Sequence, residues 1–216
     1  MARIALATLF AWCMLFTGAF GETRIVDGDT LKIDDTTYRL NGIDAPEYGQ
    51  KCNKPSGSWQ CGKEAVAELE RFATRKQIRC EPLGLDDYGR TIATCLAGDE
   101  DIGAHMVQTG MAWAFVKYSN KYVNEEAQAR QQRIGVWQSD TQTAWDYRAA
   151  RWEVAAQEAP EGCPIKGNIS PNGRIYHAPW SPWYKRTIIS VKKGERWFCN
   201  EAEALAAGWR APYWGR

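Results

Sequence analysis

Histidine, long apolar runs and repeated segments are scarce in this 216-residue sequence. Its two histidines are His105 and His177, and His105 falls in a helical pattern that favours packing or surface exposure over catalysis. The one extended apolar run is Ile4–Phe20, so no later segment is long enough to span a bilayer. Because no internal repeat or low-complexity tract is present, we expect one medium domain or two small ones.

The start of the chain has the pattern of a signal peptide. Arg3 supplies a minimal positive region, Ile4–Phe20 is apolar, and residues 19–21 form a small-x-small cleavage site. The alternative, an uncleaved anchor, is disfavoured because a span needs about 20 apolar residues. We therefore expect a leader at 1–21, Glu22 as the first mature residue, and a secreted or periplasmic protein without a membrane span in the mature chain.

Cysteines outside the leader predict disulfides. Cys13 lies in the leader, and the even number that remains in an exported chain favours three bonds over free thiols. Many pairings are open, and sequence neighbourhood favours Cys52–Cys61, Cys80–Cys95 and Cys163–Cys199. A zinc site at Cys163, His177 and Cys199 is disfavoured because the paired spacing and a fourth ligand are missing.

Hydrophobic periodicity and turn residues predict an α+β fold. Strands are expected at Thr23–Ile33 and Thr36–Ile43, joined by a turn at Asp34-Asp35, and at 78–82 and 90–96. Helices are expected at Lys63–Lys76, Ile102–Gln108, Val123–Ile134, Trp145–Gln157 and Glu201–Ala207. This order suits a small closed β-barrel of the oligonucleotide-binding type with helices packed outside it.

Composition changes near residue 160. Segment 158–162 has the Pro and Gly content of a linker. We therefore expect one domain at 22–157 and a small α+β module at 163–216, rich in Trp and Tyr. The residues from 160 onward carry an excess of Lys and Arg, whereas the preceding mature chain is acidic, and a basic module favours polyanions.

The segments "VDGDT" (26–30) and "RLNGIDAPE" (39–47) place acids where apolar strand residues would be more stable. Asp29 and Asp44 fall at the ends of neighbouring expected strands, and Glu47 follows closely. Oxygen ligands without His or Cys indicate a hard cation such as Ca²⁺ or Mg²⁺, which the carbonyl of Ala45 can also face. The alternative is a solvated Asp-Gly-Asp turn, but strand alternation directs Arg39 toward the acids and favours a binding site.

Together with "DDYGR" (86–90), these blocks resemble the staphylococcal nuclease (thermonuclease) family over about residues 24–137. The resemblance implies a five-stranded oligonucleotide-binding barrel with three helices. It also implies an endonuclease that hydrolyses phosphodiester bonds of DNA and RNA with Ca²⁺, for which Mg²⁺ and Mn²⁺ are alternatives. The domain at 22–157 is then a thermonuclease-like domain, and we expect it to act as a monomer.

The same resemblance assigns roles to individual residues. The metal ligands are Asp29, Asp44 and the Ala45 carbonyl, the base that activates water is Glu47, and the phosphate-binding arginines are Arg39 and Arg90. The family has Thr in place of Ala45, so a carbonyl ligand survives here and a hydroxyl contact does not. Elementary chemistry agrees, since two guanidinium groups and a divalent cation would stabilise the charge that develops on the phosphate.

Substrate-binding residues are predicted outside the acid cluster. Tyr88 matches a family tyrosine that contacts nucleotide, whereas Asp87 replaces a family lysine and weakens a 5′-phosphate contact. In "AWAFVKYSNKY", Lys117 and Tyr118 can hold phosphates and stack bases.

The leading expectation is an exported nuclease with little sequence specificity. One rival is a nucleic-acid-binding barrel that has lost catalysis, against which the intact acids and arginines argue. Another is an envelope-binding protein whose working part is the C-terminal module. That module resembles a small accessory unit appended to some bacterial secreted thermonucleases, and its Trp, Lys and Arg residues suit nucleic acid or envelope.

Overall fold

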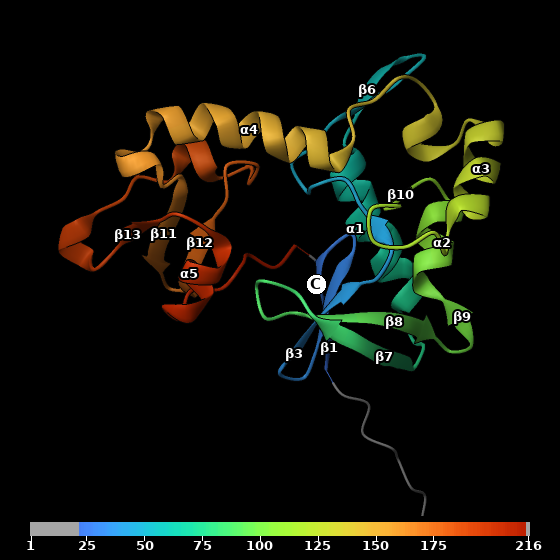
Figure 1. Cartoon of the computed structure of the whole chain (residues 1–216), viewed down its shortest axis with the longest axis horizontal. Helices are drawn as coiled ribbons and strands as arrows, with labels where there is room; N and C mark the ends of the chain where they lie inside the picture. Colours follow the sequence, from blue (N-terminus) through green and yellow to red (C-terminus); the bar gives the residue numbers. More distant parts are fainter. Residues whose placement is uncertain (1–21, 215–216) are drawn as a thin grey trace, which may run out of the picture.

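The main sheet forms the lower part of the larger unit in Figure 1, in this computed structural model, which describes residues 22–214. The predicted leader, 1–21, lies outside the described residues. The neighbouring strands, in order, are β1 (Thr23–Asp27), β2 (Thr30–Ile33), β3 (Thr36–Leu40), β8 (Thr91–Ala97) and β7 (Ile78–Leu85), and β9 (Glu100–Asp101) also pairs with β8. The pairing of β3 with β8 is parallel, and the other pairings are antiparallel.

Two expectations about these strands differ from the structure. The single strand predicted at Thr23–Ile33 is wrong, because the chain reverses at Gly28-Asp29 and pairs Asp27 with Thr30. Turn propensity of Asp and Gly outweighs strand propensity there. The sheet is also not the closed five-stranded barrel that we expected: it has six strands, and within residues 22–214 no pairing joins β7 to β1.

Helices cover the sheet through apolar faces. The first, α1 (Cys61–Ala73), buries Val66, Leu69 and Phe72, which lie at helical spacing. The predicted helix at Ile102–Gln108 is confirmed as α2, whose first turn is capped by the side chain of Asp101. The third, α3 (Val123–Gln132), packs chiefly on α2 and is followed by the left-handed residue Arg133. Helices α1 and α2 and the sheet enclose the main core, which includes Leu31, Leu40, Leu69, Ala93 and Met106.

A second, aromatic core lies beside the first. It forms around β10 (Trp113–Ala114), which pairs with β4 (Ile43–Asp44), and the short 3₁₀ helix η1 (Gly135–Trp137). Trp113 meets the rings of Trp137 and Trp145 edge to face. The hairpin of β5 (Cys52–Lys54) and β6 (Gly57–Trp59) is tied to this core by the Cys52–Cys61 disulfide.

Helix α4 (Ala144–Glu158) joins the two units of the structure (Figure 1). Thr143 caps its start by accepting a hydrogen bond from the backbone N–H of Asp146. Near that end Trp145 packs in the aromatic core, and two turns further along Trp152 packs against the C-terminal unit. Because one rigid helix contacts both cores, it sets the position of the C-terminal unit relative to the sheet.

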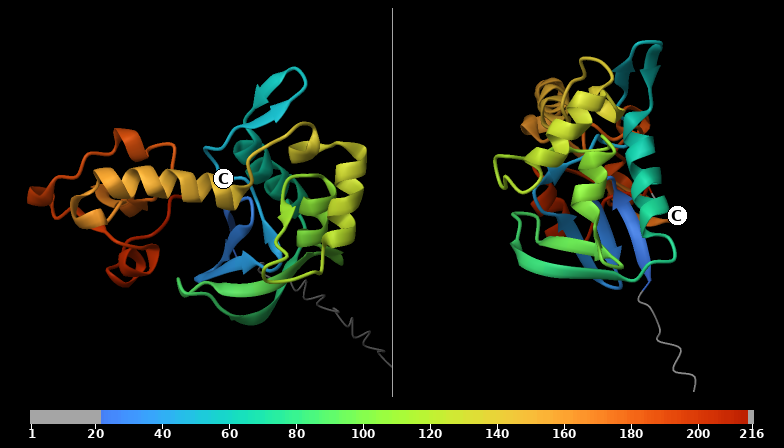
Figure 2. Two further views of the ribbon diagram at one scale, coloured as in Figure 1. Left: turned by 45° about the horizontal axis from the view of Figure 1, so that its top comes forward. Right: turned by 90° about the vertical axis from the view of Figure 1, so that its right-hand side faces the viewer.

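The C-terminal unit contains a small sheet and a helix. Strand β11 (Ile165–Ser170) pairs with β12 (Gly173–His177) and β13 (Arg196–Phe198), and α5 (Glu201–Ala206) packs on them. Short 3₁₀ helices, η2 (Pro160–Gly162), η3 (Tyr184–Arg186) and η4 (Val191–Lys193), complete the unit. After α5 the chain runs back to the main sheet (Figure 2), where Trp214 stacks on Tyr48 with ring centroids 4.2 Å apart.

All six described cysteines are paired, in the combination that sequence neighbourhood favours. Cys80 and Cys95 lie directly opposite each other on β7 and β8, and the Cys163–Cys199 bond joins the start of β11 to the end of β13. No helix within residues 22–214 is long and apolar enough to cross a membrane.

Candidate active site

The turn between β1 and β2 presents the first acid of the site. Gly28 fits closely there, because a Cβ at this position would lie 2.8 Å from the Cβ of Ala45 and 2.9 Å from that of Ala65. This close approach places the buried carboxylate of Asp29 beside β4, where its Oδ2 accepts a hydrogen bond from the Ala45 N–H at 2.9 Å. The turn at Asp-Gly-Asp is therefore packed into the protein and not solvated.

Arg39, on β3, joins the two acids that the sequence assigned to the metal. Its Nη1 lies 3.1 Å from Oδ2 of Asp29, and its Nη2 lies 3.0 Å from Oδ1 of Asp44. The Nη1 group also donates to the carbonyl of Ile43 at 3.1 Å. Since Asp44 is fully buried, this guanidinium stabilises a carboxylate that would otherwise be strongly unfavourable there.

Glu47 is positioned by the loop that follows β4. Its backbone N–H donates to Oε1 of the buried Gln50 at 3.2 Å. Gly62, in the first turn of α1, has no side chain where the Glu47 carbonyl passes, since a Cβ there would lie 1.8 Å from that oxygen. The Cys52–Cys61 disulfide closes the same loop on α1. Together these contacts direct the Glu47 side chain to the site.

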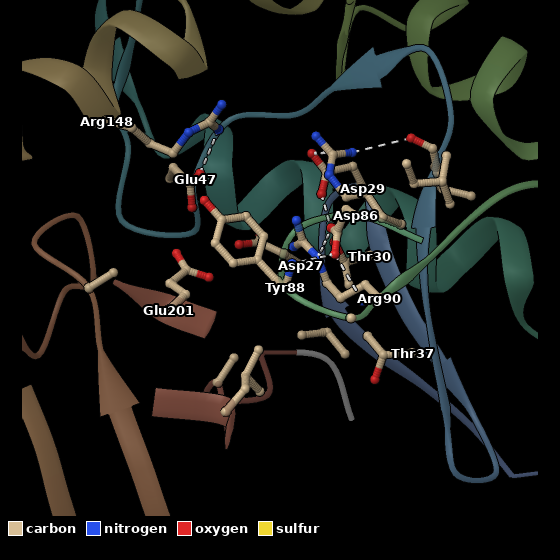
Figure 3. A pocket seen from close by; sticks show the side chains of 18 of the residues that line it. Asp27, Asp29, Thr30, Thr37, Glu47, Asp86, Tyr88, Arg90, Arg148 and Glu201 are labelled. Atoms are coloured by element: carbon tan, nitrogen blue, oxygen red, sulfur yellow. Dashed lines mark hydrogen bonds and ion pairs between the residues drawn. The ribbon is translucent and has the colours of Figure 1, made fainter. Parts of the chain in front are cut away.

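An arginine that the sequence analysis did not select completes the cluster. Arg148 of α4 donates from Nη1 and Nη2 to the two oxygens of Asp44, at 3.1 and 2.8 Å, and from Nη1 to Oε1 of Glu47 at 2.8 Å. Figure 3 shows its side chain pointing at Glu47. In the sequence Arg148 lies within an ordinary charged helix, and no local pattern distinguishes it from Arg151.

Three carboxyl groups at the cluster, those of Asp27, Asp44 and Glu47, have a raised pKa. Burial raises the pKa of Glu47 to about 7, with repulsion from Asp29 and Asp44 adding to it and Arg148 opposing it. Burial and the charges of Glu47 and Asp29 also raise the pKa of Asp27 well above its ordinary value. Negative charge is therefore in excess here even with the two arginines present.

Arg90 lies on the turn between β7 and β8. Its Nε donates to Oδ2 of Asp86 at 2.7 Å, and the Tyr88 ring lies 5.2 Å from its guanidinium carbon. Although burial acts to lower the pKa of Arg90, Asp86 and Glu201 raise it above its ordinary value. Glu201 comes from α5 and faces the same space (Figure 3). Sequence patterns gave no reason to place this acid of the C-terminal unit near Arg90.

One cavity of about 830 Å³ connects these groups and is lined by both units of the chain. Of the predicted site residues, those that line it are Asp29, Arg39, Glu47, Tyr88, Arg90 and Tyr118. Asp44 and Ala45 lie beneath its wall, and Lys117 stands outside it, 5.4 Å from the Tyr118 ring. The C-terminal unit contributes the opposite wall, which includes Trp180, Glu201 and Trp214.

Within residues 22–214, no three His, Cys, Asp or Glu side chains are arranged as a ready-made metal site. Both oxygens of Asp44 accept hydrogen bonds from guanidinium groups. The predicted carboxylate ligands, Asp29 and Asp44, are therefore neighbours, and Arg39 lies between them.

Comparisons with known proteins agree with this fold. A family model described as staphylococcal nuclease homologue matches residues 37–139, and a second, described as ArfC, matches residues 147–211. The micrococcal nuclease of Shigella flexneri is 33% identical over 145 residues, which cover 59% of this chain and 78% of that protein. The thermonuclease of Staphylococcus intermedius is 34% identical over 126 residues, covering 53% and 73%.

Another relative has a name of a different kind. The succinoglycan biosynthesis protein ExoI of Rhizobium meliloti is 32% identical over 136 residues, covering 61% of this chain and 71% of that protein. The α+β fold and these matches define the class, a nuclease built on a domain of the oligonucleotide-binding type. The chain belongs to the staphylococcal nuclease family and is an endonuclease, a hydrolase of phosphodiester bonds.

Proposed function

We propose that this endonuclease is exported, depends on a divalent metal, and cleaves DNA and RNA with little sequence specificity. One observation supports this most: Asp29, Arg39, Asp44 and Glu47, from three separate segments, converge in one hydrogen-bonded cluster beside a cavity that Arg90 also lines. A binding protein without catalysis would gain no stability from so many buried or half-buried charges.

The donor set of the cluster fits a hard cation. Its side chains offer oxygen atoms only, and burial together with mutual repulsion raises the pKa of Asp27, Glu47 and Asp44. A divalent cation would relieve that excess of negative charge. We propose Asp29, Asp44 and the carbonyl of Ala45 as its ligands and Ca²⁺ as the ion, with Mg²⁺ and Mn²⁺ as alternatives.

The mechanism then assigns one task to each remaining group. When bound, the metal supplies Lewis-acid stabilisation of the developing charge on the phosphate. Glu47 takes the proton from the attacking water, and a pKa near neutrality suits that role. Arg39 and Arg90 bind the phosphate oxygens with donors whose positions are set before substrate arrives. Asp86 holds Arg90 in place through its Nε group.

Substrate binding is proposed along the cavity. Aromatic rings of Tyr88 and Tyr118 line it and offer surfaces on which bases can stack. Stacking tolerates any base, which agrees with low sequence specificity. Lys117, beside Tyr118, would hold phosphates at the edge of the same surface.

Export and domain organisation also belong to the proposal. The three disulfides, which persist in oxidising compartments, support a secreted or periplasmic location. The predicted leader at 1–21, the division into 22–157, 158–162 and 163–216, and the monomeric state stay predictions.

Incubation of the purified protein with plasmid DNA and with RNA tests the proposal. Each substrate is incubated with Ca²⁺, Mg²⁺ or Mn²⁺ and with EDTA, and product size is followed on gels. Cleavage of both substrates that stops in EDTA is expected. Full activity in EDTA would contradict metal dependence, and cleavage of only one substrate would contradict the lack of sugar specificity.

A further inference from the structure

The guanidinium of Arg148 reaches the acid cluster from outside the segment that matches the nuclease family model, which ends at residue 139. It makes a two-pronged pair with Asp44 and a third hydrogen bond to Glu47, all at 2.8–3.1 Å. The Asp44 side chain is 0% exposed and that of Arg148 is 25% exposed. This is a partly desolvated, charge-assisted contact and not a flexible surface pair.

Helix α4 holds Arg148 at this place through contacts near its start. The side-chain N–H of Gln50 donates to the carbonyl of Gln142 at 2.7 Å, which ties the Glu47 loop to the residue before the helix cap. Trp145 stacks on Phe115 with ring centroids 5.3 Å apart. Residues three apart share a helix face, so the packing of Trp145 turns Arg148 toward the site.

The hydrogen bonds of Asp44 leave little room for a further cation. Its Oδ1 accepts from Arg39 and Arg148, and its Oδ2 accepts from Arg148. The two arginines differ in how firmly they are held. Arg39 is also bound by Asp29 and by the carbonyl of Ile43, whereas the hydrogen bonds of Arg148 go to Asp44 and Glu47. A metal that needs an Asp44 oxygen would therefore displace Arg148 more easily than Arg39.

We propose that Arg148 is a positioning residue that competes with the metal. It holds Asp44 and Glu47 in place before metal binds, and it must release Asp44 when the metal binds. The affinity for the metal is therefore lower than the same ligands would give without Arg148, and it depends on the placement of α4. This inference rests on the metal site of the proposed function.

Calorimetric titration of Ca²⁺ into the full mature chain tests the competition. The proteins compared are the wild type, Arg148→Ala and Arg148→Gln, with Arg151→Ala as the matched control. Arg151 lies on the same helix, is exposed, and stands over the Tyr147 ring. Removal of Arg148 is expected to lower the Kd for Ca²⁺ by roughly tenfold or more, since close charge pairs couple at least that strongly. The control removes the same charge and is expected to bind as the wild type does.

Thermal unfolding supplies a second measurement that needs no activity. Without metal, both Arg148 variants should unfold at lower temperature than the wild type, because Asp44 loses its partner. Saturating Ca²⁺ should raise their Tm by more than it raises that of the wild type. The glutamine variant keeps hydrogen-bond donors, so it carries the test if the alanine variant does not fold.

Three results would overturn the competition. The first is an equal Kd for Ca²⁺ in the wild type and Arg148→Gln, and the second is weaker Ca²⁺ binding by that variant. An equal gain in Ca²⁺ affinity in Arg151→Ala would mean that loss of any positive charge on α4 has this effect, without competition at Asp44. If none of the proteins binds Ca²⁺, both the proposed metal site and this inference are wrong. If all bind Ca²⁺ with the same affinity, only this inference is wrong.

Discussion

Among the individual residues of the cluster, Glu47 has the environment best suited to proton transfer. Changing Glu47→Gln removes the base but keeps a side chain of the same shape between Arg148 and the cavity. We expect the fold to persist and kcat to fall by roughly 10²–10⁴-fold, the usual contribution of a positioned base. Single-turnover cleavage of a labelled oligonucleotide measures it, with the exposed Glu64→Gln as control. Near-normal turnover would remove Glu47 from the mechanism.

The two predicted phosphate-binding arginines should respond differently to lysine. Arg39→Lys and Arg90→Lys each keep the charge and lose the planar fork, so each should reduce kcat by about 10²–10³-fold. Arg39→Lys should also lower the Tm, because one lysine cannot bridge Asp29 and Asp44 as the guanidinium does. Arg90→Lys loses a pair with Asp86 that is less buried, and its Tm should change less.

Cleavage rates and melting curves check both arginine variants, with Arg79→Lys on the exposed face of β7 as control. Full activity of both lysine variants would show that the phosphate role assigned to these arginines is wrong.

At the scale of elements, the Cys80–Cys95 disulfide clamps the β7–β8 hairpin whose turn carries Arg90. The bonded residues are 15 apart in sequence, and closing such a loop contributes roughly 3 kcal/mol in the chain-entropy model. Replacing both cysteines with alanine should lower stability by about that amount, and activity should fall more than Ca²⁺ affinity. Urea unfolding and calorimetry measure the two effects.

The bond between Cys163 and Cys199 offers a control for this hairpin, because it lies in the other unit. Its removal should affect stability without loosening the Arg90 turn. If loss of the Cys80–Cys95 bond leaves both stability and activity unchanged, the clamp has no role.

His177 makes the C-terminal sheet sensitive to acid. Burial lowers the pKa of His177 from 6.5 to about 4, and Lys166 acts in the same direction. Between those values the unfolded chain binds a proton that the folded chain does not, so stability is lost as the pH falls from about 6.5 to 4. The expected loss from this residue is at most about 3 kcal/mol.

Replacing His177→Gln should flatten this part of the stability profile, because glutamine does not titrate. Amide groups can still reach Ser181 and Asn168, which hold the two ring nitrogens. Urea unfolding at pH 4.5 and 7 measures the difference. Parallel profiles for the two proteins would mean that His177 is not the group responsible.

On the scale of the whole molecule, the C-terminal unit is part of the active-site cavity. Burial raises the pKa of Glu201, with Arg90 opposing the shift, and its carboxylate accepts a hydrogen bond from the Tyr176 hydroxyl at 3.0 Å. When ionised, this acid faces the path of a polyanionic substrate. Glu201→Gln should therefore lower the KM for DNA several-fold at low salt, and the gain should shrink as salt rises.

Steady-state kinetics at two salt concentrations check the effect of Glu201, with the exposed Glu153→Gln on α4 as control. A KM that is unchanged or higher at low salt would contradict a substrate path between the two units.

Local sequence was enough for several parts of this protein. The helix predicted at Ile102–Gln108 is present in the structure, and its cap, Asp101, is the residue directly before it. Cysteine pairing followed sequence neighbourhood because each pair lies across one hairpin or within one small unit. The motif residues Asp29, Arg39 and Asp44 can be recognised in the sequence because charges near strands need partners and because the blocks that contain them resemble the nuclease family.

Tertiary structure alone decided the rest. Arg148 meets Asp44 across 104 positions, and Glu201 and Trp214 reach the cavity from another unit. Such contacts produce no periodic or local pattern in the sequence. They depend on where α4 and the C-terminal segment pack in the folded protein. The same holds for the open sheet. Strand β4 pairs with β10, which is distant in the sequence, and not with a strand of the main sheet. The sequence by itself determined which charged groups need partners, and packing determined which partners they have.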